Sequence, residues 1–197
     1  MLNVKSVVSR FILFQSYLII SLVLLGSHIT MGQNNFNGSF EIKSLLQNEP
    51  VGWFATRVPQ TKDFVVFNWD STEYHSGSYS VSIAIDSAHS QDLIAYNWTR
   101  TFKDFTIGNK YVISGWIKTM KLKETAWIVV QCWDENQKII NFSSNQYSHP
   151  VQGTTDWTLV KTDFTVPDGT KEVRIRVGIA SPENNGGKVW FDDIKID

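Results

Sequence analysis

From residue 38 onward, apolar and polar residues alternate in short runs, and no stretch has the 3.6-residue spacing of an amphipathic helix. Alternation predicts half-buried β-strands, because successive side chains of a strand point to opposite faces. Sequences rich in Gly, Pro, Asn and Asp separate the runs and predict turns. The runs are residues 39–42, 64–69, 79–85, 93–102, 111–119, 126–133, 139–144, 157–166, 172–180 and 188–196. This spacing predicts an all-β fold, an antiparallel β-sandwich of two sheets.

The first 32 residues have a different pattern. Lys5 and Arg10 precede a mostly apolar stretch over residues 11–25, and Thr30 and Gly32 place small side chains before Gln33. This order is typical of a secretory signal peptide. We therefore expect residues 33–197 to form one secreted or extracytoplasmic domain, without membrane contact once residues 1–32 are removed. The alternative is an uncleaved anchor helix, because about 17 apolar residues can span a bilayer.

Charge and cysteine content narrow the class of protein. Loss of Lys5 and Arg10 with the leader changes the formal net charge from −1 to −3. A nucleic-acid partner is not expected, since such proteins present a basic surface. Cys132 is the only cysteine, so an intramolecular disulfide is excluded. All eight tryptophans follow residue 32, which makes aromatic side chains the main candidates for either core packing or ligand binding.

One strand carries two rows of opposite character. Between residues 125 and 135, Ala126, Ile128, Val130 and Cys132 form an apolar row suited to a core. The opposite row holds Trp127, Gln131 and Trp133. Sugars stack their apolar faces on aromatic rings and hydrogen-bond to flanking amides and charged groups, so this row has the chemistry of a carbohydrate platform.

Two other runs carry further candidate contacts for a sugar. Trp116 lies on the outer face of residues 111–119, and it joins Trp127, Gln131 and Trp133 on one concave surface if the two strands are neighbours. Arg174 and Arg176 point outward from residues 172–180 as contacts for hydroxyl or carboxylate groups. The alternative is that these rings fill the core, as large aromatics in sandwiches usually do. Alternation places Trp190 on the same face as Ile194 and Ile196, so we assign it to the core.

Two acidic residues interrupt the closing run. Asp192 and Asp193 lie inside residues 188–196, although Asp is disfavoured in strands and its burial costs solvation unless a positive group compensates. Glu41 lies near the other end of the predicted domain. If the two ends pair, these carboxylates are placed to share a calcium ion. Alternatively, the two Asp side chains are solvated and Glu41 pairs with a lysine.

Several short motifs follow one another along the chain in a recognisable order. They are Asn37-Gly38-Ser39-Phe40-Glu41, Gly52-Trp53, the stretch from His75 to Val81, Tyr111 to Trp116, Asp156-Trp157, Phe164-Thr165-Val166-Pro167 and Phe191-Asp192-Asp193-Ile194. This order resembles the jelly-roll carbohydrate-binding modules of the families 4, 9 and 22 group, in the galactose-binding-like superfamily. The resemblance covers residues 35–197 and implies a jelly-roll sandwich that binds a polysaccharide or oligosaccharide, with Trp53 and Trp157 in its core.

The resemblance also implies a structural calcium ion where the N-terminal and C-terminal strands meet. The matching ligands are Glu41, the backbone carbonyls near Ser39 and Ser78, and Asp192 or Asp193. Asp192 is preferred because strand alternation places it on the same face as Ile194 and Ile196, pointing into the domain.

No catalytic residue is predicted. The Glu-x-Asp-x-x-Glu motif of jelly-roll glucanases and the Gly-x-Ser-x-Gly motif of hydrolases are both absent from the sequence. We therefore expect a non-enzymatic binding module. The alternatives are a protein-interaction or adhesion module built on the same sandwich, and a diverged polysaccharide lyase or hydrolase.

Overall fold

The computed structural model describes residues 36–197, so the predicted signal peptide and the boundary at residue 33 lie outside the described residues. This part of the chain contains nine β-strands, two 3₁₀ turns and no α-helix. None of its helices has the length and apolar character needed to span a membrane. The elements are β1 (Phe54–Ala55), η1 (Pro59–Thr61), β2 (Val65–Asp70), β3 (Ser80–Ile85), β4 (Ala95–Phe102), β5 (Lys110–Trp133), β6 (Ile139–Ser144), η2 (Asn145–Tyr147), β7 (Val151–Thr165), β8 (Glu172–Ala180) and β9 (Lys188–Ile196).

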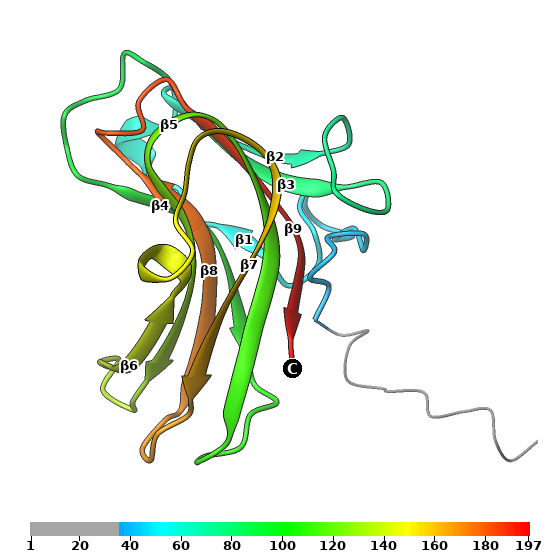
Figure 1. The fold of residues 1–197 in the computed structure, drawn as a ribbon, viewed down its shortest axis with the longest axis vertical. Helices are drawn as coiled ribbons and strands as arrows, with labels where there is room; N and C mark the ends of the chain where they lie inside the picture. The colour runs from blue at the N-terminus through cyan, green and yellow to red at the C-terminus, as the bar shows by residue number, and fades with distance from the viewer. Residues whose placement is uncertain (1–35) are drawn as a thin grey trace, which may run out of the picture. The chain divides into compact units, whose positions relative to one another are not determined.

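The strands form two five-stranded antiparallel sheets that share β5. Sheet I has the order β1-β4-β8-β5-β6, and sheet II has the order β2-β3-β9-β5-β7. Residues 127–133 of β5 pair in sheet I, while residues 113–120 pair with β9 in sheet II. Figure 1 shows β5 (green) rising along the domain, arching over at one end and descending on the other side. The runs 111–119 and 126–133 are therefore two halves of one strand.

The core lies between the two sheets. In β5, Ile113 and Ile117 are buried on the sheet II side, and Ile128 and Val130 are buried on the sheet I side. Alternating residues of β3, β4, β8 and β9 complete the core, including Ile83, Trp98, Ile175 and Phe191. These observations confirm the predicted all-β, antiparallel sandwich and the assignment of Ala126, Ile128, Val130 and Cys132 to its interior.

The N-terminal segment is not a strand, in contrast to the prediction for residues 39–42. Asn37 and Phe40 have positive φ angles of 48° and 58°, which break extended pairing. The two ends of the domain nevertheless meet, because the Ile194 N–H donates a 2.9 Å hydrogen bond to the Gly38 carbonyl. The side chain of Trp53 also reaches this segment and donates from Nε1 to the Asn37 carbonyl at 2.9 Å. Trp53 is buried, as expected.

A bulge in β9 reverses the predicted facing of its residues. Asp193 has a φ of 49°, so alternation is interrupted and Phe191 and Ile194 both face the core. Trp190 and Asp192 consequently lie on the outer face of sheet II. The argument that Asp192 points inward with Ile194 and Ile196 was therefore wrong. Trp190 is buried, as predicted, but it lies outside the main core cluster between the sheets.

Candidate functional site

The outer face of sheet I holds four of the five predicted sugar-binding residues. Trp127, Gln131 and Trp133 alternate along β5 with residues that are buried in the core. Arg176 comes from the adjacent strand, where the β5–β8 register pairs Val129 with Arg176 and Gln131 with Arg174. Because antiparallel partners in register point to the same side, these side chains share one surface.

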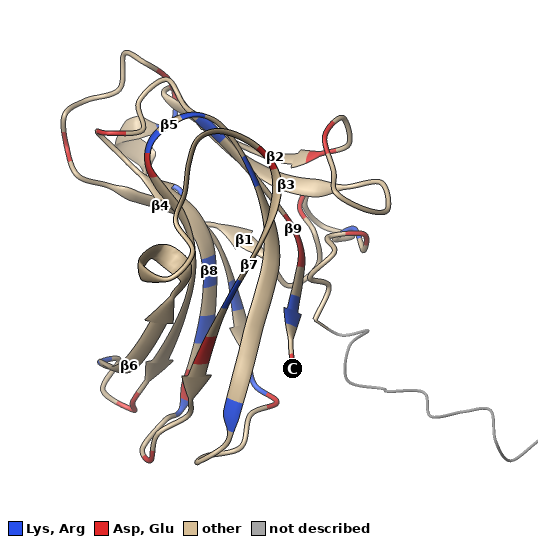
Figure 2. Cartoon of the chain, viewed as in Figure 1, with Lys and Arg blue, Asp and Glu red and all other residues tan. Residues whose placement is uncertain are grey.

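Trp133 lies at the centre of the polar contacts on this face. The guanidinium carbon of Arg174 lies 4.2 Å from the centroid of its ring, and that of Arg176 lies at 5.9 Å. Both distances fall within the range of cation–π attraction. Figure 2 shows the basic positions along β8. The closer guanidinium, that of Arg174, lies over the ring and holds the indole in a defined position.

Three buried polar atoms on this face have no hydrogen-bond partner in the described part of the chain. They are Gln131 Oε1, Trp133 Nε1 and Arg176 Nε, one acceptor and two donors. A buried polar atom left unpaired costs about 1–3 kcal/mol, so such groups normally find a partner. The three atoms lie on the same face of sheet I, so this face retains hydrogen-bonding capacity that the described residues do not use.

Trp127 does not offer an open ring. Only 8% of its surface is exposed, and its ring occupies the space that a side chain at position 178 would fill, 2.7 Å from where a Cβ of Gly178 would lie. Trp127 therefore stacks on the sheet itself. The sequence predicted an exposed Trp127 ring, whereas the structure places that ring against the sheet.

Trp116 lies on the other sheet, away from the remaining predicted residues. Its segment of β5 pairs with β7 and β9, and Trp116 stacks on the His75 ring with centroids 3.9 Å apart. The predicted common surface assumed two neighbouring strands, but a single strand crosses from one sheet to the other. Trp157 also packs against His75 and is half-buried on this outer face, so its assignment to the core was wrong.

Two exposed rings beside the face were not predicted. Phe142 of β6 is opposite Gln131 in the register and is 59% exposed, and Phe54 of β1 is opposite Thr99 and is 50% exposed. Alternation within residues 139–144 places Phe142 and Ser144 on the same face of that run, so the sequence contains the information needed to predict the first of these rings. β1 has only two residues, which is too short for any periodicity to reveal Phe54.

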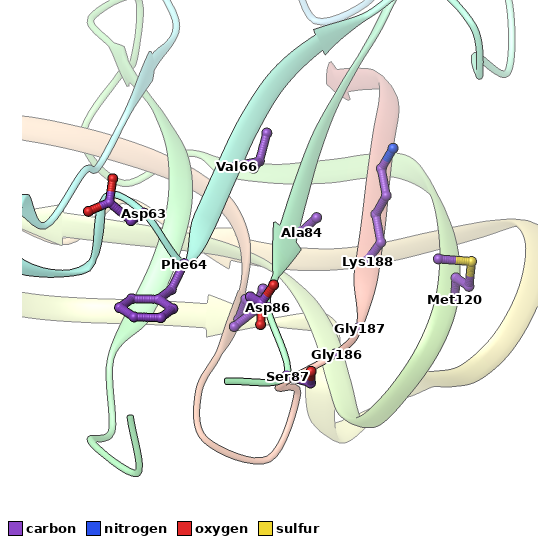
Figure 3. Close-up of a pocket in the computed structure, with 11 residues that line it drawn as sticks. Asp63, Phe64, Val66, Ala84, Asp86, Ser87, Met120, Gly186, Gly187 and Lys188 are labelled. Atoms are coloured by element: carbon purple, nitrogen blue, oxygen red, sulfur yellow. The ribbon is translucent and has the colours of Figure 1, made fainter. Parts of the chain in front are cut away.

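A separate pocket of about 330 Å³ opens on the other side of the sandwich. Its lining comes from the ends of β2 and β3 and from the turn before β9, with Phe64, Met120 and Lys188 around it, as Figure 3 shows. None of the predicted sugar-binding residues lines this pocket. The orphaned polar atoms and the exposed rings therefore point to the outer face of sheet I.

The predicted calcium ligands converge on one loop. Glu41 Oε1 accepts hydrogen bonds from the backbone N–H groups of Ser78 and Tyr79, both at 3.0 Å. Asp192 Oδ2 accepts from the N–H groups of His75 and Ser76 at 2.9 and 3.1 Å. The loop over residues 75–79 therefore joins the N-terminal segment that contains Ser39 and Glu41 to β9.

The charge of Asp192 has no paired cation. Its side chain is fully buried, and none of the ion pairs among the described residues involves Asp192 or Glu41. Burial raises the pKa of Asp192 to about 7, despite the three backbone N–H groups that hydrogen-bond to it. An uncompensated buried carboxylate suits a cation, and oxygen donors suit calcium. The described residues contain no group of three or more His, Cys, Asp or Glu that could hold a metal, so backbone carbonyls or water would have to supply further ligands.

Comparison with solved structures defines the fold. The CBM22-1 xylan-binding domain of Paenibacillus barcinonensis Xyn10C aligns with a TM-score of 0.53 and 15% identity, over 81% of this chain and 90% of that domain. A CBM4 structure aligns with a TM-score of 0.51 and 19% identity, over 82% of this chain and 97% of that one. The fold is therefore the β-sandwich of carbohydrate-binding modules.

The sequence itself assigns the family. Residues 33–184 match the family CBM_4_9, described as a carbohydrate binding domain, and the chain belongs to this family. The tRNA nuclease WapA of Bacillus subtilis strain 168 is 26% identical over 162 residues, which are 82% of this chain and 7% of that protein. The chain thus spans a small fraction of the length of this curated relative.

Proposed function

We propose that this protein is a secreted, non-catalytic module that binds a polysaccharide or oligosaccharide on the outer face of sheet I. The observation that carries the proposal is the group of unpaired buried atoms, Gln131 Oε1, Trp133 Nε1 and Arg176 Nε. Sugar hydroxyl groups both donate and accept hydrogen bonds, so one ligand can satisfy all three atoms. Membership of a carbohydrate-binding family and the fold of a xylan-binding domain support the same conclusion.

The apolar part of binding comes from rings on either side of these polar atoms. Trp133 supplies an indole held by arginine, while Phe142 and Phe54 supply exposed rings on β6 and β1. A chain of several sugar units lying across the strands would meet an aromatic surface, then polar groups, then another ring. This order combines stacking with orientation by a few polar groups, as is general for ligand sites.

Binding is tested with purified protein and a panel of soluble and insoluble polysaccharides, by isothermal titration calorimetry and by co-sedimentation. We expect Trp133→Ala to weaken binding by about 10-fold or more, since it removes both the stacking surface and the indole N–H. Tyr74→Ala is the matched control, because Tyr74 is an exposed aromatic residue in a loop beside sheet II. Absence of binding across the panel, or binding that Trp133→Ala leaves intact, would contradict the proposal.

We also infer that a structural calcium ion joins Glu41, the backbone carbonyls near Ser39 and Ser78, and Asp192. The supporting observations are the shared contact of the two carboxylates with residues 75–79 and the lack of a paired cation at buried Asp192. The ion would neutralise that carboxylate and hold three distant segments together. Secretion is supported by the leader-like pattern of residues 1–32.

A further inference from the structure

The two arginines of the binding face differ in their partners. Arg174 Nε forms an ion pair with Glu172 Oε1, and Arg174 Nη2 donates a hydrogen bond to Gln137 Oε1 at 2.7 Å. Arg176 makes no ion pair and no hydrogen bond with the described residues, and its Nε is buried without a partner. Arg174 is therefore neutralised within the protein, and Arg176 is not.

The neighbours of Arg176 compensate its charge only in part. In the register it lies between Thr99 on β4 and Val129 on β5, and both are uncharged. Glu172, which lies on the same face of β8, already binds Arg174 and accepts a hydrogen bond from Thr101. The sequence Glu172, Arg174, Arg176 along β8 thus leaves one positive charge on this face.

That charge is costly without a ligand. Burial lowers the pKa of the Arg176 guanidinium and the nearby Arg174 charge lowers it further, while the Glu172 charge opposes them only in part; arginine nevertheless stays protonated in proteins. A neutral sugar can accept hydrogen bonds from Arg176, but its hydroxyl groups leave the half-buried charge uncompensated. A carboxylate supplies both the acceptor atoms and the opposite charge, in a geometry that matches the guanidinium.

We propose that the ligand of this face is an acidic glycan, and that Arg176 binds the carboxylate of a uronic acid unit while Trp133 stacks on the same or the adjacent sugar. This inference rests on the proposed carbohydrate-binding function and specifies its substrate class. It assigns different roles to the two arginines: Arg174 positions the Trp133 indole, and Arg176 selects for the charge of the ligand.

The test compares polysaccharides that differ only in charge. Polygalacturonate, alginate and glucuronoxylan are each titrated beside their carboxyl-reduced forms at about 0.15 M ionic strength, where long-range attraction is screened beyond about 8 Å. We expect at least one acidic polymer to bind about 10- to 100-fold more tightly than its reduced form, which corresponds to one charge-assisted hydrogen-bonded pair. Arg176→Gln should abolish this difference, whereas Arg176→Lys should keep part of it.

Lys195→Gln is the matched control, because it removes one exposed positive charge from β9 on the other sheet. Thermal unfolding of each variant shows whether it is folded. Equal affinity for acidic and reduced polymers would overturn this inference but leave carbohydrate binding intact. Equal weakening of both forms by Arg176→Gln would show a structural role and would also overturn it. Binding to no polymer would overturn the proposed function as well.

A sulfate ester presents the same kind of anionic oxygens, so dextran sulfate and dextran form a separate arm. Tighter binding to dextran sulfate than to every uronate would reject the carboxylate assignment. Preference for a uronate over dextran sulfate at matched charge density would support it.

Discussion

Asp70 of β2 is a buried carboxylate that contacts Ser82 of β3 and Trp190 and Lys188 of β9. Its Oδ1 accepts hydrogen bonds from the N–H and hydroxyl of Thr72, and its Oδ2 accepts from Trp190 Nε1 at 3.0 Å and lies 3.3 Å from Lys188 Nζ. Burial raises the pKa of Asp70, but these hydrogen bonds and the Lys188 charge outweigh burial and hold that pKa well below its usual range. Asp70 therefore stabilises the fold in its ionised form.

The sign of the pH effect follows from this lowered pKa. As pH falls below about 4, the unfolded chain binds a proton at Asp70 before the folded chain does, so the free energy of unfolding decreases. We expect Asp70→Asn to lower the free energy of unfolding at pH 7 by at least about 1 kcal/mol and to flatten its decline between pH 5 and pH 2. Urea unfolding followed by tryptophan fluorescence over this range measures both effects.

Asp163→Asn provides the comparison, because Asp163 forms an exposed ion pair with Lys110. Exposed pairs contribute little, so this variant should resemble the wild-type protein at pH 7. An Asp70→Asn protein with the same acid sensitivity as wild type would contradict the assigned role of Asp70.

Single residues show where sequence reasoning succeeds. Alternation placed Gln131 and Trp133 on the outer face of one strand and Arg176 on the outer face of another, and the structure brings them together because β5 pairs with β8 in a regular register. Their role in sugar binding stays a prediction. Trp127 shares the face but is buried, since its ring covers Gly178 of the adjacent strand. Trp127 and Gly178 are distant in the sequence, so alternation within one strand cannot predict their contact.

At the scale of the element, β5 carries the largest difference between prediction and structure. The polar residues between 119 and 126 predict a break, whereas the strand continues through them and changes sheets. The pairing with β7 is irregular there, with register shifts between Thr119, Leu122 and Ala126. Strand β9 shows the same kind of difference. The bulge at Asp193 reverses which face the following residues occupy. Alternation indicates facing only within an uninterrupted register.

Lys121 offers a test of how β5 changes sheets. It has a φ of 57°, a left-handed conformation that β-branched residues adopt poorly, and its N–H is held by the Thr154 hydroxyl at 3.0 Å. We expect Lys121→Val to lower the free energy of unfolding by about 1–2 kcal/mol, and Lys121→Gly to stay within about 1 kcal/mol of wild type. Urea denaturation measures both values.

The control is Lys123→Val, since Lys123 is exposed in the same segment and has no positive φ. Because valine suits extended backbone, it should be tolerated at 123 and not at 121. Equal effects of valine at the two positions would show that the conformation of Lys121 is not what shapes the crossing.

At the scale of the whole molecule, the segment around Gly38, the loop over residues 75–79 and β9 meet at one place. If calcium holds them together, its removal should destabilise the entire domain. We expect EDTA to lower the Tm by roughly 5–10 °C relative to millimolar CaCl₂, as linkage predicts for a ligand at about 100 times its Kd in a domain of this size. Differential scanning calorimetry in EDTA, CaCl₂ and MgCl₂ measures this difference.

Asp192→Asn should remove the calcium response, whereas Asp163→Asn, which changes an exposed carboxylate, should retain it. Identical Tm values for the wild-type protein in EDTA and in CaCl₂ would contradict the proposed ion.

The overall architecture was predictable because it depends on many residues at once. About ten alternating runs specify two sheets even when one run is misplaced, such as residues 39–42, or missed, such as β1. The candidate site depends on a few individual side-chain contacts, including the Arg174–Glu172 pair within β8 beside Arg176, which has no ion pair. Composition and spacing do not encode which of two neighbouring arginines has a partner.

The position of β9 in the middle of sheet II has a consequence for how the protein is made. β9 lies between β3 and β5, although it is synthesised after both of them. Until residues 188–196 emerge, β3 and β5 each present an unpaired edge that is available to other chains. The nascent domain is therefore most exposed to misassociation after β3 and β5 have been made and before β9 follows them, and shielding by a chaperone matters most over that interval.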